Sequence, residues 1–202
     1  VEGGSYDFVV KWGDGTSDTI TAHDQAEATH EYATRGTKHI TISGDIEGWS
    51  FAGGGDRLKL VEVSNWGSLR LGNQGAAFHG AENLTVSATD VLDLTGTTDL
   101  HDTFRGATQF NGDVTGWQTG AVTDMSGMFA DAESFDRDLS GWDTSSVTTM
   151  RSMFKGSAFT GVVSEWDVTS VTDFVGMFQD IPAMTEASFI NWYSRLLVAW
   201  AG

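Results

Sequence analysis

The hydrophobic positions of this chain recur with a period of 24 or 25 residues. Each period contains one phenylalanine, a second phenylalanine five or six residues later, and then a tryptophan. The clear copies align on Phe104, Phe129, Phe154 and Phe178, on Phe110, Phe135 and Phe159, and on Trp117, Trp142 and Trp166. Self-similarity at such a period indicates a repeat protein, in which each copy buries its apolar side chains against its neighbours.

Two segments of each repeat carry the apolar side chains. Phe135 and Leu139 are spaced so that they point inward on an extended segment with polar residues on its outer face. Residues 125–129 have apolar side chains at i, i+3 and i+4, which suits a single helical turn. Asp124 and Asp173 precede two such segments, and we expect them to act as N-caps.

A weaker form of the pattern continues upstream and extends the repeat region. Phe78 lies 26 residues before Phe104, and apolar residues occupy related positions back to Leu58. The prediction is a mainly β chain, a leucine-rich-repeat-type β-solenoid over residues 49–182.

The N-terminal segment 1–48 is predicted to be a β cap on this solenoid. Residues 8–12 and 39–43 alternate between apolar and polar side chains, and residues 13–15 read Gly-Asp-Gly, a hairpin turn signal. The residues Trp12-Gly-Asp-Gly-Thr16, followed by His30-Glu-Tyr32 and Gly36-Thr-Lys-His-Ile40, resemble part of a PKD-type β-sandwich, but the segment is too short for a whole one.

The C-terminal segment 183–202 changes to a helical period. We expect a capping helix that closes the last repeat, rather than a helix for a partner or a membrane. Its apolar positions are Phe189, Trp192, Tyr193, Leu196, Leu197 and Trp200.

Composition narrows the possible functions. The net charge is −17, from 28 acidic residues against 11 lysines and arginines, which argues against nucleic acid and anionic membranes as partners. There are no cysteines, and no run of 18 apolar residues that would suggest insertion into a membrane. The sequence carries no recognised catalytic motif, so we expect a non-enzymatic, monomeric domain of a larger exported protein.

The aligned acids are the best candidates for a site. Asp113 and Asp138 share one repeat position, and Asn111 and Asp136 share another. Carboxylates about 4.8 Å apart repel each other, and a hard cation such as Ca²⁺ reverses that repulsion. The alternative is a solvated acidic face, which the sequence does not separate from a metal site.

The remaining candidate residues lie around these positions. Asp102 and Asp131 are predicted to add carboxylate ligands to the calcium site, whereas Asn111, Asp136, Ser140 and Thr115 are predicted to contact the bound ligand.

The repeats resemble the BspA-like leucine-rich repeats of bacterial surface proteins. The resemblance rests on Val122-Thr-Asp-Met-Ser-Gly-Met-Phe129, on Ser134-Phe-Asp-Arg-Asp-Leu-Ser-Gly-Trp142 and on Asp143-Thr-Ser-Ser-Val-Thr148. It implies an extracellular recognition domain rather than an enzyme. The combination of acidity, β cap, repeats and helical cap is also similar to the peptide-binding domain of giant RTX adhesins, which implies calcium-dependent capture of exposed peptide ends.

The sequence therefore leads to one main hypothesis and two alternatives. The main hypothesis is calcium-dependent adhesion to a peptide or protein on a target cell surface. The first alternative is a glycan-binding surface domain, in which an exposed tryptophan such as Trp49 or Trp66 would stack on sugar rings. The second is a structural spacer without a ligand.

Overall fold

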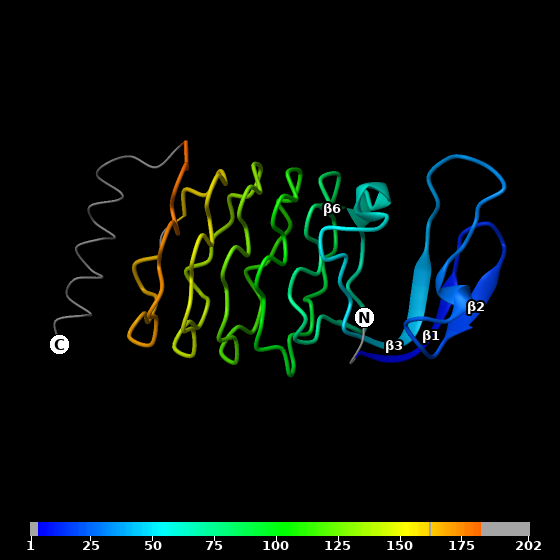
Figure 1. Ribbon diagram of the computed structural model, residues 1–202, viewed down its shortest axis with the longest axis horizontal. Coiled ribbons are helices and arrows are strands. Elements are labelled where there is room, and N and C mark those ends of the chain that lie inside the picture. The colour runs from blue at the N-terminus through cyan, green and yellow to red at the C-terminus, as the bar shows by residue number, and fades with distance from the viewer. Residues whose placement is uncertain (1–3, 162, 183–202) are drawn as a thin grey trace.

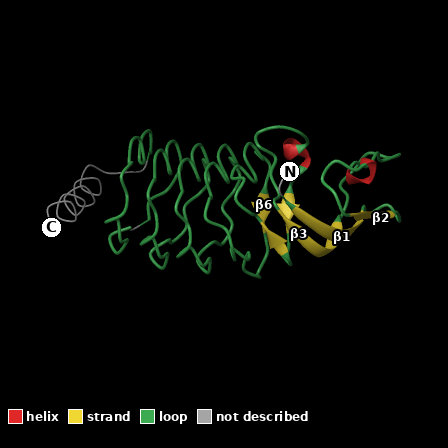
Figure 2. Cartoon of the chain, turned by 60° about the horizontal axis from the view of Figure 1, so that its bottom comes forward, coloured by secondary structure: helices red, strands yellow, loops and turns green. Residues whose placement is uncertain are grey.

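The computed structural model describes residues 4–161 and 163–182, which form a mainly β structure without an α-helix in those ranges (Figures 1 and 2). The strands and 3₁₀ turns are short. They are β1 (Ser5–Lys11), β2 (Ser17–Ile20), η1 (Ala26–Ala28), β3 (Thr41–Glu47), η2 (Arg57–Lys59), β4 (Glu62–Val63), β5 (Leu69–Arg70) and β6 (Thr85–Val86). No helix in the described ranges is long and apolar enough to cross a membrane.

The N-terminal segment forms most of a four-stranded sheet in the order β2-β1-β3-β5. β1 is antiparallel to β2 and β3, whereas β3 is parallel to β5, which lies among the first repeats. Phe8, Val10, Ile20 and Ile46 form a small core under this sheet. The alternation in residues 8–12 therefore predicted the buried face of β1 correctly.

The second predicted strand of this region differs from the observed one. β3 begins at Thr41, where it pairs with Lys11 at the end of β1, rather than at residue 39. Ile40 is 47% exposed and Ile42 is 39% exposed, so within the described ranges these side chains are not covered at this end of the sheet. A period of two shows which side chains share a face, but not whether that face is covered.

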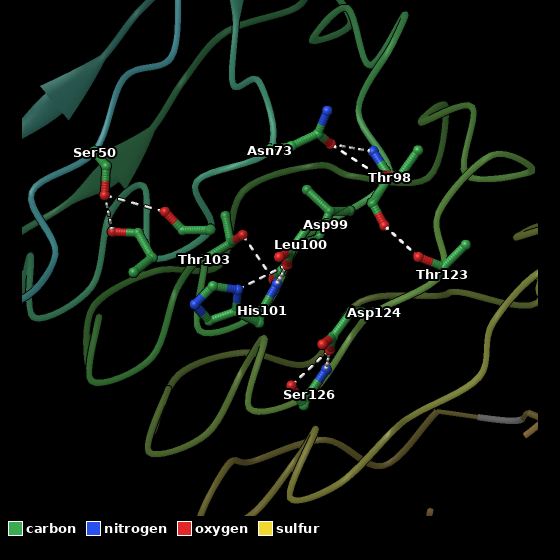
Figure 3. A network of polar contacts seen from close by, with 12 residues as sticks. Ser50, Asn73, Thr98, Asp99, Leu100, His101, Thr103, Thr123, Asp124 and Ser126 are labelled. Carbon is green, nitrogen blue, oxygen red and sulfur yellow. Dashed lines mark hydrogen bonds and ion pairs between the residues drawn. The ribbon is translucent and has the colours of Figure 1, made fainter. Parts of the chain in front are cut away.

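The repeats lie side by side along the long axis of the molecule (Figure 1). Equivalent residues of successive repeats are joined by isolated parallel bridges, as between Asp99 and Asp124 and between Asp124 and Thr149. A row of threonines reinforces these contacts. The hydroxyl of Thr123 donates to the carbonyl of Thr98 at 3.1 Å, and Thr148 donates to Thr123 at 3.0 Å (Figure 3 shows the first pair).

Stacked aromatic side chains fill the interior between the repeats. Phe129 lies 5.8 Å from Phe104 and 5.8 Å from Phe154, measured between ring centroids, with nearly parallel planes. Trp117 and Trp142 stack in the same way at 6.3 Å. All five side chains are buried, as the aromatic period predicted. Burial of side chains this large dominates the energy of a core.

The segment at residues 125–129 is a series of hydrogen-bonded turns, so the predicted helical turn is wrong. Gly127 has φ +61°, a left-handed conformation that an α-helix does not contain. Asp124 therefore caps no helix; its Oδ1 accepts a hydrogen bond from the backbone N–H of Ser126 at 2.8 Å and closes a turn instead (Figure 3). The predicted helix at 183–202 lies outside the described residues.

Candidate functional site

The two aligned aspartates predicted to bind calcium each stabilise their own backbone turn. Oδ1 of Asp113 accepts hydrogen bonds from the backbone N–H of Thr115 at 3.0 Å and from its hydroxyl at 2.7 Å. Oδ1 of Asp138 accepts a hydrogen bond from the N–H of Ser140 at 2.9 Å. These bonds favour the charged form, so they lower the pKa of both carboxyl groups. Thr115 and Ser140, predicted to contact a ligand, are the partners in these turns.

The same turn recurs wherever an aspartate stands two residues before a serine or threonine. Such Asx turns are a common use of aspartate, because its short side chain reaches the N–H two residues ahead. The signal is present in the sequence as Asp-x-Ser or Asp-x-Thr, but alignment of the repeats alone does not bring it out. The turns begin at Asp14, Asp93, Asp113, Asp124, Asp138, Asp143 and Asp167.

Asn111 and Asp136 link neighbouring repeats to each other. Oδ1 of Asn111 accepts a hydrogen bond from the N–H of Asp136 at 3.2 Å. Oδ1 of Asp136 in turn accepts bonds from the N–H and the hydroxyl of Thr160, at 2.8 and 2.9 Å. Arg137 donates two hydrogen bonds to the carbonyl of Asn111, and its charge contributes to the lowered pKa of Asp113. A cationic side chain thus offsets part of the repulsion on this face.

Asp102 and Asp131 lie in a different place, a groove that crosses three successive repeats on the side of the methionine–phenylalanine turns. Asp113 and Asp138 do not line this groove. We call it the charged groove, and its lining residues are His101, Asp102, Arg105, Ser126, Gly127, Ala130, Asp131, Arg151, Ser152 and Lys155.

The depth of the charged groove comes from the small residues of its middle repeat. Ala130 occupies the same repeat position as Arg105 on one side and Lys155 on the other. Ala130 is 3% exposed, and together with Ser126 and Gly127 it forms a floor between two walls with long side chains. The groove therefore exists because a short side chain interrupts a row of long cationic ones.

Left-handed backbone positions bring the two aspartates into the groove. Asp102 has φ +50° and Asp131 has φ +57°, a region that aspartate tolerates better than most residues. The carboxylate of Asp102 lies where a side chain on Gly127 would be, and Oδ1 of Asp131 would be 2.7 Å from a Cβ on Gly156. Both carboxylates are thus held over a glycine of the next repeat.

The cationic side chains of the groove are only partly neutralised. Arg105 donates one hydrogen bond to Asp102 at 3.3 Å, and Arg151 donates one to Asp173 at 3.1 Å. Lys155 forms no ion pair with any carboxylate of the described ranges. A single bond uses one of the five N–H donors of a guanidinium group. The groove therefore retains free hydrogen-bond donors on both walls.

The four predicted metal ligands do not assemble into one site. Two lie in the charged groove and two in Asx turns, and within residues 4–161 and 163–182 no three acidic or histidine side chains form a group able to hold a metal ion. Calcium binding at Asp113 and Asp138 stays a prediction.

These observations define a mainly β repeat protein with a charged groove across its turns. Residues 73–192 match the family described as "Mycoplasma protein of unknown function, DUF285", and because the match spans more than half of the chain, the chain belongs to this family. No curated protein and no solved structure matches the chain.

Proposed function

We propose that this chain is a peptide-binding adhesion domain, built as a leucine-rich-repeat-type β-solenoid with an N-terminal β cap and a C-terminal helical cap, and displayed outside the cell as part of a bacterial surface or RTX-type adhesin. The observation that carries this proposal is the charged groove, which presents side chains of both signs across three repeats. An extended peptide carries charges of both signs and polar backbone groups, so it complements such a lining.

The rigidity of the repeats supports binding by this groove. The residues that line the groove belong to turns that follow the buried Leu100, Met125 and Met150, each 0% exposed. A peptide would therefore meet turns whose backbone is already anchored by buried side chains, which lowers the entropic cost of binding.

The glycan alternative has less support. Trp66 is 4% exposed, and Trp49 is half-buried and packs on Phe51 at 5.3 Å between ring centroids. None of the tryptophans in the described ranges is exposed, whereas stacking on a sugar ring needs an open aromatic face. If the domain is instead a spacer without a ligand, substitutions in the groove should not change the result of any binding assay.

The proposal is tested by measuring binding of the domain to an immobilised library of short peptides with free ends, in calcium and in chelator. We expect selective binding that is reduced by Lys155→Gln and strengthened by calcium. Lys59→Gln is the matched control, because Lys59 is an exposed cation outside the groove that pairs with Asp56. Absence of peptide binding in both solutions would contradict the proposal, and equal binding in both would remove calcium from it.

A further inference from the structure

The charge of the groove is less negative than that of an average patch of the surface. The chain has 28 acidic residues and 11 lysines and arginines, so an average patch of its surface is negative. The groove holds three of those cations, Arg105, Arg151 and Lys155, against Asp102 and Asp131, and the adjacent Asp173 pairs with Arg151. Composition alone predicts a clear excess of carboxylates, whereas here cations and carboxylates are equal in number, and Lys155 has no carboxylate partner in the described ranges.

We infer that the charged groove binds a single carboxylate on an acidic side chain of a peptide, held between Arg151 and Lys155 without a metal ion. This inference rests on the proposed function and specifies its ligand. Arg151 and Lys155 stand four residues apart on one wall, next to the small residues of the floor. A guanidinium fork and an ammonium group are the two side chains that best bind a carboxylate.

The neighbouring charges define what the site accepts. Arg151 uses one donor on Asp173, which leaves the rest of its fork available, and Lys155 has no carboxylate partner in the described part of the chain. Asp131 lies on the floor side and repels a second negative group. The site therefore accepts one compact anion and disfavours a polyanion, which the net charge of −17 repels as well.

The shape of the groove also limits the ligand to one small anionic group. Ala130 leaves a gap one repeat wide between Arg105 and Lys155, and one repeat corresponds to about 4.8 Å along the stack. The walls therefore stand about 10 Å apart, which is enough for one carboxylate-bearing side chain over the floor. Filling the gap at position 130 should block binding without any change of charge.

The test compares two peptides that differ in one charge. The probes are acetylated and amidated Gly-Ser-Glu-Ser-Gly and its Gln counterpart, titrated into ¹⁵N-labelled protein in chelator. We expect the Glu peptide to shift the amide signals of Ser126, Gly127 and Ala130, and to bind at least about fivefold more tightly than the Gln peptide, because only Glu offers a charge-assisted contact. Blocked termini ensure that only the side-chain carboxylate differs.

Three variants locate the interaction. Lys155→Gln and Arg151→Gln should each weaken binding of the Glu peptide at least about fivefold and remove its advantage over the Gln peptide. Ala130→Gln should weaken both peptides, and Gln179 shows that the same repeat position accommodates this side chain. Lys59→Gln should leave binding unchanged. Retention of the amide dispersion of the ¹⁵N spectrum in each variant confirms that the variant is folded.

Several outcomes would overturn the inference. Equal affinity for the Glu and Gln peptides, signal shifts outside the groove, or an equal loss in Lys59→Gln would each exclude it. Inorganic sulfate that binds as tightly as the Glu peptide would assign the groove to free anions, and tighter binding of a sulfated disaccharide would assign it to glycans. If library peptides bind but show no preference for Glu, the inference fails while the proposed function stands. If no library peptide binds, the proposed function fails, and the Glu and Gln pair still tests the groove.

Discussion

Oδ1 of Asp113 accepts two hydrogen bonds from Thr115, one from its backbone N–H at 3.0 Å and one from its hydroxyl at 2.7 Å. The contact closes an Asx turn, and the bond from the backbone N–H recurs at every aspartate that precedes a serine or threonine by two residues. Seven of the 28 acidic residues are therefore bound into turns of this kind. Because these carboxylates accept hydrogen bonds in their charged form, the stability of the fold depends on their ionisation.

Acid should unfold the domain below about pH 4. Hydrogen bonds lower the pKa of Asp113, Asp138, Asp143 and Asp167 in the folded state, relative to about 3.9 in an unfolded chain. Their stabilisation is complete above the unfolded value, and it is lost as the pH falls through that value toward the folded pKa. The melting temperature should be nearly constant from pH 7 to 5 and fall steeply from pH 4 to 2.

Circular dichroism melting curves across this pH range test the prediction. Asp113→Asn should flatten the decline slightly, because the amide oxygen still accepts the N–H of Thr115 but does not titrate. A melting temperature that stays constant down to pH 2 would show that these turns contribute no pH-dependent stability.

Calcium should raise the melting temperature if Asp113 and Asp138 bind it, and magnesium should raise it less. A ligand at tenfold excess over its Kd stabilises the folded state by about 1.4 kcal/mol. The double variant D113N/D138N should lose the response. Asp143→Asn and Asp167→Asn together make the matched control, since they remove the same charge from two other Asx turns. A response that survives in D113N/D138N would place the ion elsewhere.

Gly127→Ala should destabilise the domain by about 1–2 kcal/mol or more, because φ is +61° and an alanine there adopts a left-handed conformation. The new Cβ would also collide with the carboxylate of Asp102. Adding Asp102→Gly should restore part of the loss, because it removes that carboxylate. Urea unfolding of the two single variants and the double variant measures this coupling. Gly141→Ala is the control, since no other atom lies within 4 Å of the position of its Cβ; an equal loss there would contradict the steric explanation.

Trp142→Phe should cost more stability than Trp117→Phe, although both indoles are buried and belong to one stack. Nε1 of Trp142 donates to the carbonyl of Val114 at 3.0 Å, whereas Nε1 of Trp117 has no hydrogen-bond partner among the described residues. Removing the first donor loses one buried hydrogen bond, which costs about 0.5–1.5 kcal/mol beyond the loss of packing, while the carbonyl of Val114 keeps its bond from the backbone N–H of Trp117. Chemical denaturation of the two variants gives the difference. Equal losses would mean that the bond to Val114 adds nothing to packing.

The two candidate regions differ in how far the sequence predicted them. The aligned aspartates were visible in the repeat register, but their use was not, because a carboxylate in an Asx turn and one in a metal site occupy the same sequence position. The sequence analysis predicts Asp102 and Asp131 as calcium ligands together with Asp113, but the structure places them in the charged groove. Alignment of the repeats groups residues that occupy equivalent positions, but it does not show which side of the repeat each residue faces.

The sequence by itself determined the repeat period, the identity of the buried aromatic residues and the buried face of the first strand. Large apolar side chains must leave water wherever the chain folds, so their spacing alone reveals them. Only the tertiary structure decided that Ala130 leaves a gap between Arg105 and Lys155, and that left-handed residues bring Asp102 and Asp131 beside it. A groove depends on how the side chains of three neighbouring repeats differ in length and on the backbone conformation of each turn, and both take effect only once the repeats lie side by side.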